Sequence, residues 1–152
     1  MSKNGCFVLN LGPKADGTFC EEEKNIISEL GKWTKTNEEA IWGTHPYKVF
    51  GEGKTQKGGS FTEHFSYTSK DYRFTCKTGV VYAFSLKPKG KSEFKIKTLA
   101  DTMDVFHCVI KNISVLGSDA DVSFSQNKKC LTIKLSEKVN TTMPVCFKIE
   151  VD

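Results

Sequence analysis

The side chains of this chain that can do chemistry are its carboxylates, thiols and imidazoles. The 152 residues include 18 Asp and Glu, six Cys and three His. Paired carboxylates serve as general acid and base, and Cys with His holds zinc when the ligands recur at short spacings. The cysteines are widely spaced without a C-x-x-C pair, and no His lies at a ligand-like spacing from a Cys. We therefore expect no metal site and no cofactor, and no Ser-His-Asp or Cys-His motif occurs.

The acidic residues mostly fit structural positions. Glu21, Glu22 and Glu23 would form the first turn of a helix, where negative charge favours the helix dipole. Asp16 is different, because it lies in a loop that directly follows an apolar run. We keep Asp16 as a candidate binding residue. The cysteines are interpreted as small buried thiols of a reduced protein.

Residues 1–45 predict a single strand–loop–helix unit. The apolar run from Phe7 to Leu11 is typical of a strand buried on both faces, and glycine and proline mark a loop after it. Residues 20–36 then predict an amphipathic helix. Gly31 lies within its apolar stripe, which costs about 1 kcal/mol of helix propensity and indicates close packing against a neighbour. The stripe consists of Ile26, Ile27, Leu30 and Trp33.

Residues 46–152 change from a helical period to a period of two. Seven or so short alternating segments, separated by Gly, Asn and Pro turns, predict an antiparallel β-sandwich. Residues 50–69, rich in glycine, are expected to form a long irregular connection. The segments are 72–76, 80–86, 94–96, 112–116, 122–124, 131–135 and 145–151. The predicted fold is therefore mainly β, an antiparallel β-sandwich preceded by one strand–loop–helix unit.

Length and charge exclude several classes of protein. A (β/α)8 barrel takes about 250 residues, more than this chain has. No apolar run approaches the roughly 20 residues of a membrane-spanning helix. A thinly spread net charge of +4 gives little support for nucleic-acid binding. We expect neither a membrane nor a nucleic acid as partner, and the early apolar run is too short for a signal peptide.

A series of short motifs follows in order along the first 86 residues. It consists of Asn4-Gly5, Phe7-Val8-Leu9-Asn10-Leu11-Gly12-Pro13, Asp16-Gly17-Thr18, Leu30-Gly31-Lys32-Trp33, Asn37, Glu39-Ala40-Ile41 and Gly43-Thr44, then Phe61-Thr62, residues 67–75 and Val81-Tyr82-Ala83. The motifs up to Thr44 resemble the end of the catalytic barrel in α-L-fucosidases of glycoside hydrolase family 29. The later ones resemble the start of that family's C-terminal β-sandwich. The departures are Cys6, Glu38, Trp42 and His45-Pro46-Tyr47.

The resemblance implies that residues 1–45 are the last strand–loop–helix unit of a (β/α)8-type barrel and residues 46–152 the sandwich. In this family the nucleophilic Asp and the acid/base carboxylate lie upstream, so we expect no catalytic residue here and no activity of the chain alone. Whether it is part of an enzyme stays open. The family includes lysosomal, secreted and periplasmic proteins, so no compartment is assigned.

The expected function is therefore to support the barrel and to shape access to a fucosylated glycan. One alternative is a stand-alone, lectin-like carbohydrate-binding module, and another is an α-L-fucosidase active only with a complementing barrel. Candidate substrate-binding residues are Asp16, Trp42 and Tyr47, although Trp33 and Trp42 also suit packing between helix and sandwich. Expected partners are a fucosylated glycan, and a barrel domain or a second copy of this chain paired through the strand from Phe7 to Leu11.

Overall fold

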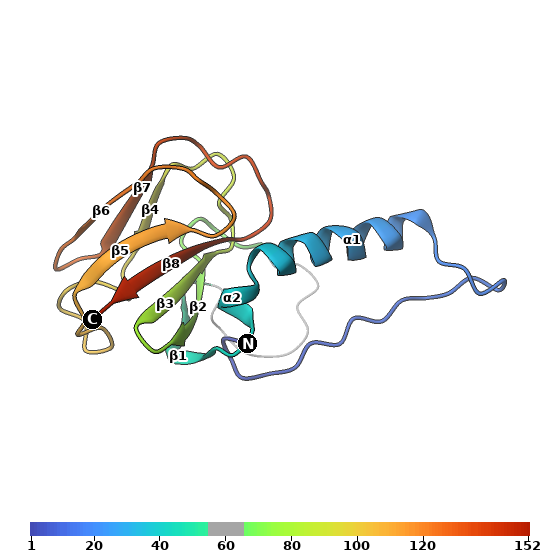
Figure 1. Cartoon of the computed structure of the whole chain (residues 1–152), viewed down its shortest axis with the longest axis horizontal. Coiled ribbons are helices and arrows are strands. Elements are labelled where there is room, and N and C mark those ends of the chain that lie inside the picture. Colours follow the sequence, from blue (N-terminus) through green and yellow to red (C-terminus); the bar gives the residue numbers. More distant parts are fainter. Residues whose placement is uncertain (55–65) are drawn as a thin grey trace.

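The computed structural model describes residues 1–54 and 66–152. A β-sandwich forms one end of the molecule, and helix α1 (Glu21–Thr36) projects from it together with the extended segment that precedes the helix (Figure 1). We call residues 1–36 the arm. A second, short helix, α2 (Glu38–Ile41), follows α1 and lies against the sandwich. The motif residues Phe61 and Thr62 lie outside the described residues.

The described part of the sandwich has two antiparallel sheets. The five-stranded sheet has the order β1-β2-β3-β8-β5, and the three-stranded sheet has the order β4-β7-β6. The strands are β1 (His45–Glu52), β2 (Tyr72–Lys77), β3 (Val80–Ser85), β4 (Glu93–Ile96), β5 (Ile110–Val115), β6 (Val122–Gln126), β7 (Leu131–Leu135) and β8 (Val145–Val151). The prediction of a mainly β, antiparallel sandwich is confirmed.

The core lies between the two sheets because alternate residues of their strands point inward. In β7, Leu131 and Ile133 are buried while Lys134 is exposed, as the alternation predicts. The ring of Phe147 on β8 meets that of Phe94 on β4 edge to face, with 4.8 Å between centroids. Aromatic contacts of this kind connect the two sheets across the core.

The outer face of the five-stranded sheet is covered as well. Tyr82 and Phe84 on β3 and Cys146 on β8 are buried on that face beneath Ala40 of α2, with Trp33 of α1 packed beside them. The sequence pattern predicts that alternate residues of β8 lie in water. That expectation is wrong at Cys146, because the short helix α2 replaces solvent there.

Two predictions about local structure are corrected. Strand β1 begins at His45, inside the expected junction, and ends within residues that were expected to be an irregular connection. Residues 7–11 form no strand within the described chain, and Phe7 and Val8 are exposed. A strand requires a hydrogen-bonded neighbour, and this segment has none among the described residues.

Phe147 gives a direct test of the core. Phe147→Ala is expected to lower the free energy of unfolding by about 3–5 kcal/mol, because the side chain is fully buried and leaves a cavity. Phe124→Ala on β6 is the control, since that ring is 39% exposed and should cost less than half as much. Denaturant unfolding followed by circular dichroism measures both. Equal losses would contradict the described core.

Candidate functional site

Asp16 lies in the exposed loop that leads into α1. Its Oδ1 accepts hydrogen bonds from the backbone N–H of Thr18 at 2.9 Å and from the Thr18 hydroxyl at 2.7 Å. The backbone N–H, and secondly the hydroxyl, lower the pKa of Asp16, because both stabilise its charged form. Asp16 thus closes a local turn, and its assignment to ligand binding stays a prediction.

Trp42 and Tyr47 lie in different surroundings. Trp42 follows α2 and is 65% exposed, so of the two tryptophans only Trp33 packs between helix and sandwich. Tyr47 on β1 is half-buried, its ring meets Phe74, and its hydroxyl donates to the carbonyl of Val105 at 2.5 Å. Burial raises the pKa of Tyr47 to about 12. Asp16, Trp42 and Tyr47 share no hydrogen bond in the described structure.

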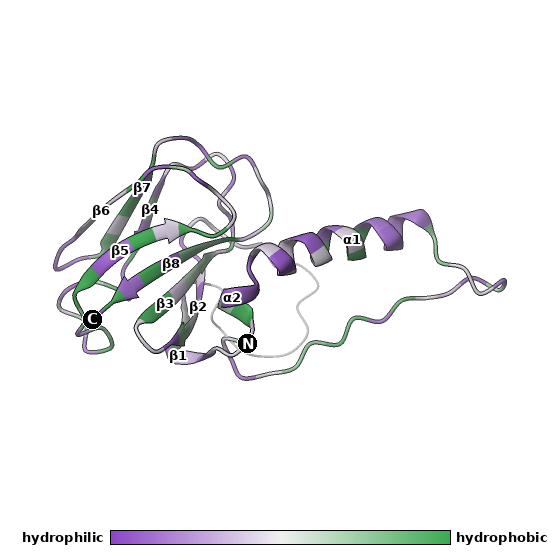
Figure 2. Ribbon diagram, in the orientation of Figure 1, coloured by the Kyte–Doolittle hydropathy of each residue, from purple (hydrophilic) through white to green (hydrophobic). Residues whose placement is uncertain are grey.

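The arm exposes apolar side chains along its length. Figure 2 shows an apolar stretch in the extended segment before α1, where Phe7 is 78% and Val8 88% exposed. The helix itself has 16 residues and none of them is buried, although Ile26 and Ile27 belong to its apolar stripe. A soluble amphipathic helix normally covers that stripe with a neighbour. Within the described residues, the sandwich covers this stripe at Trp33, whereas Ile26 and Ile27 stay exposed.

A shallow groove of about 510 Å³ runs between the extended segment and the helix. Leu9 of the extended segment, Ile27 and Leu30 of the helix, and Trp42 all line it. Gly31 also lines it, and a Cβ added there would meet nothing within 4 Å. The close packing that the sequence indicates at Gly31 is therefore not present in the described chain.

The base of the arm is attached to the sandwich by polar contacts. The indole N–H of Trp33 donates to the carbonyl of Pro144 at 2.6 Å, and the hydroxyl of Thr75 donates to the carbonyl of Ala40 at 2.9 Å. Gly117, between β5 and β6, approaches the helix so closely that an added Cβ would lie 2.1 Å from Cγ2 of Thr36. The end of α1 is thus fixed in position.

Glu39 of α2 is the centre of a charged network that sequence reasoning missed. Its Oε1 accepts a hydrogen bond from the Tyr82 hydroxyl at 2.8 Å and lies 2.9 Å from Nζ of Lys148. The Lys148 contact, more than the Tyr82 contact, lowers the pKa of Glu39 against a smaller opposing effect of burial. Tyr82 and Lys148 are opposite each other in the β3–β8 register, which only strand pairing reveals.

The described residues hold no group of three or more His, Cys, Asp and Glu side chains placed to bind a metal ion. All six cysteines are free, and the expectation that they are buried is correct only for Cys146. Cys6 is exposed, and the other four are half-buried because they lie at strand ends and on the arm. None of the described helices has the length and apolar character needed to cross a membrane.

The class that this geometry defines is an antiparallel β-sandwich carrying a helical arm. Its backbone superposes on an alpha-fucosidase from Thermotoga maritima with a TM-score of 0.71 at 21% identity, covering 97% of this chain and 31% of that one. It matches alpha-L-fucosidase isoenzyme 1 from Paenibacillus thiaminolyticus with a TM-score of 0.68 at 19% identity, covering 99% and 32%. These likenesses show the fold.

Comparison of the amino-acid sequence also finds fucosidases. The family model described as "Alpha-L-fucosidase" matches residues 1–39, which include the arm. The tissue alpha-L-fucosidase of Mus musculus is 26% identical over 148 residues, which are 97% of this chain and 28% of the relative. The plasma alpha-L-fucosidase of Homo sapiens is 32% identical over 87 residues, 57% of this chain and 16% of the relative.

The chain is thus similar to alpha-L-fucosidases in sequence over 97% of its length and in fold, and its first 39 residues match the model of that family. It spans less than a third of the length of these relatives.

The Glu39 network predicts a pH-dependent contribution to stability. Because the folded pKa of Glu39 lies below its ordinary 4.5, its contribution is present above that pH and is lost as the pH falls through the folded pKa. Glu39→Gln should cost about 1 kcal/mol or less at pH 7, and the difference should shrink below pH 4.5. Glu29→Gln, which removes the exposed pair with Lys32, is the control and should change little. A loss that stays constant down to pH 3 would contradict the network.

Gly117 tests how closely the arm approaches the sandwich. Gly117→Ala should lower the free energy of unfolding by about 1–3 kcal/mol more than Gly90→Ala. Both glycines have a positive φ, but a Cβ at Gly90 meets nothing within 4 Å. Adding Thr36→Ala to Gly117→Ala should recover most of the excess. Equal losses at the two glycines, measured by denaturant unfolding, would refute the close approach.

Proposed function

We propose that this chain is the non-catalytic C-terminal region of an α-L-fucosidase-like glycoside hydrolase. Its arm packs against the barrel that carries the catalytic carboxylates, and the sandwich holds the base of the arm in place. The observation that carries the proposal is the exposed apolar surface of the arm. It comprises the extended segment around Phe7 and Val8 and the exposed part of the stripe of α1.

The direction of the pKa shifts among the carboxylates supports a non-catalytic role. Retaining glycosidases need a nucleophilic carboxylate and a general acid whose pKa is raised, about 5–5.5 Å apart. The pKa values of Asp16, Glu39 and Glu93 are shifted, and all three are lowered by hydrogen bonds or lysine contacts. A lowered pKa suits a turn or an ion pair and opposes the role of general acid.

The shape of the arm favours a barrel as its partner. An extended segment followed by a helix that returns beside it is the repeating unit of a (β/α) barrel, in which strands pair with strands and helices cover them. The backbone N–H and C=O groups of residues 7–11 could form hydrogen bonds with a neighbouring strand. The apolar stripe of α1 could pack against a neighbouring helix. Pairing with a second copy of the chain would give hydrogen-bond partners to the backbone of residues 7–11 but would leave the apolar stripe of α1 uncovered.

A stand-alone module that binds sugar through Trp42 and Tyr47 has less support. The Tyr47 hydroxyl is engaged by Val105, and the two rings belong to separate surroundings. A complementing barrel, by contrast, would restore a complete site around the loop that holds Asp16. In that arrangement Asp16 lies on the side of the barrel where active sites form, because it follows the carboxyl end of the strand segment.

A graft tests the proposal. Residues 1–152 replace the matched C-terminal region of the tissue alpha-L-fucosidase of Mus musculus, and release of p-nitrophenol from p-nitrophenyl α-L-fucoside is measured. The graft should hydrolyse this substrate, and the isolated chain should release none. Val8→Asp in the graft should reduce both the rate and the thermal midpoint, because it puts a charge into the apolar contact with the barrel.

Val109→Asp is the matched control, since Val109 is also exposed but lies on the sandwich. It should leave rate and midpoint close to those of the parent graft. A soluble graft with a folded sandwich in which Val8→Asp and Val109→Asp behave alike would refute docking through the arm. Saturable hydrolysis by the isolated chain, lost on Asp16→Asn, would refute the non-catalytic role.

A further inference from the structure

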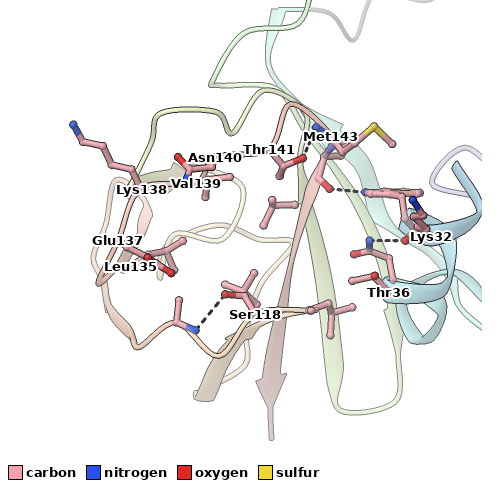
Figure 3. Close-up of a pocket in the computed structure, with 18 of the residues that line it drawn as sticks. Lys32, Thr36, Ser118, Leu135, Glu137, Lys138, Val139, Asn140, Thr141 and Met143 are labelled. Atoms are coloured by element: carbon pink, nitrogen blue, oxygen red, sulfur yellow. Dashed lines mark hydrogen bonds between the residues drawn. The ribbon is translucent and has the colours of Figure 1, made fainter. Parts of the chain in front are cut away.

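A hollow of about 430 Å³ lies where the base of the arm meets the sandwich. The end of α1, the turn between β5 and β6 and the loop between β7 and β8 surround it, and Figure 3 shows Thr36, Ser118 and Thr141 on its different sides. Small-molecule sites typically have volumes of roughly 300–1,000 Å³. The hollow is separate from the groove of the arm, and Trp42 does not line it.

Asn37 forms part of the inner wall of this hollow. The residue is only 3% exposed, and its Nδ2 donates to the carbonyl of Trp33 at 2.8 Å. Its Oδ1 is buried and accepts no hydrogen bond from the described residues. A buried amide oxygen without a donor costs about 1–3 kcal/mol. Because this oxygen is closed off from solvent, a ligand hydroxyl reaches it only when a neighbouring side chain of the wall moves aside.

The rim offers further polar groups with spare capacity. The Ser118 oxygen accepts from the backbone N–H of Ala120 at 3.2 Å, and the Thr141 oxygen accepts from that of Met143 at 3.0 Å. Each hydroxyl proton is therefore left to donate. Asn140, the neighbour of Thr141, also lines the hollow, and its amide can both donate and accept.

Charge and apolar lining narrow the class of ligand. Two lysines and two glutamates line the hollow, and Lys32 with Glu29 forms an ion pair at 2.7 Å. Glu137 and Lys138 also have opposite charges, and Lys138 extends away from the hollow in Figure 3. The lining is therefore close to neutral. Its apolar part includes Trp33, Val115, Leu116, Met143, Pro144 and Val145.

We propose that this hollow binds an uncharged polyhydroxylated ligand, a neutral sugar unit. Ligand hydroxyls accept from Ser118 and Thr141, and the C–H face of the ring lies on the apolar lining. A small movement of the wall would let a further ligand hydroxyl donate to Oδ1 of Asn37. The proposal does not depend on docking of the arm, because the exposed residues Phe7, Val8, Ile26 and Ile27 do not line the hollow.

The two tryptophans allow sugar binding in the hollow to be detected directly. The indole N–H of Trp33, at the edge of the hollow, and that of exposed Trp42 give separate signals in a ¹H–¹⁵N NMR spectrum of the 152-residue chain. Titration with L-fucose, D-galactose, D-glucose and N-acetylglucosamine should shift the Trp33 signal in a saturable way for at least one sugar. The Trp42 signal should stay unchanged. D-glucuronate should bind more weakly than D-glucose, because the lining has no surplus of positive charge.

A matched pair of variants locates the binding. Ala120→Trp places a large ring in the hollow and should weaken binding roughly tenfold or more. Asp119→Trp introduces the same side chain one residue away, where it does not line the hollow, and should keep the affinity of the parent chain. Thermal unfolding of both variants verifies that they are folded.

Three results would overturn the proposal. The first is the absence of a saturable Trp33 shift with all four neutral sugars. The second is equal weakening by Ala120→Trp and Asp119→Trp when both are folded. The third is stronger binding of D-glucuronate than of any neutral sugar. A graft that fails to hydrolyse its substrate would refute docking by the arm and leave the Trp33 titration unaffected.

Discussion

The covering of the outer face of the five-stranded sheet is the interaction on which the rest of this structure depends. Tyr82, Phe84 and Cys146 would face water without Ala40 and Trp33 above them. Burial of a large apolar side chain contributes about 1.5–3 kcal/mol, so this small cluster is enough to hold the short helix α2 in place. Because α2 directly follows α1, the same cluster fixes where the arm leaves the sandwich (Figure 1).

The two faces of that sheet therefore perform different tasks. The inner face contributes to the main core of the sandwich, which includes Phe94 and Phe147. The outer face connects the sandwich to the arm, through apolar contacts and through the network of Glu39, Tyr82 and Lys148. A stable sandwich is thus joined to a helix that buries none of its own residues. In the proposed arrangement, contact with the barrel would stabilise this helix.

Local periodicity predicted most of the sandwich, because alternation in segments such as 131–135 depends only on which face is buried. It missed β1, where Pro46 and Gly51 resemble turn residues and the pairing with β2 is irregular between them. It also predicted a strand at residues 7–11, because an apolar run carries no information about whether a neighbouring strand is present. Spacing along the chain likewise could not place Asp16, Trp42 and Tyr47 relative to one another, or bring Glu39 to Lys148.

Asn37 is the C-cap of α1 and the N-cap of α2, so this one residue joins the two helices. With 16 residues rising 1.5 Å each, α1 extends about 24 Å from that residue, so a rotation of about 10° displaces its far end by about 4 Å. The hollow beside Asn37 lies at the base of α1. A small change of packing there would displace the far end of the helix more than a change elsewhere along it. Asn37, which is 3% exposed, therefore lies at the point from which the arm extends.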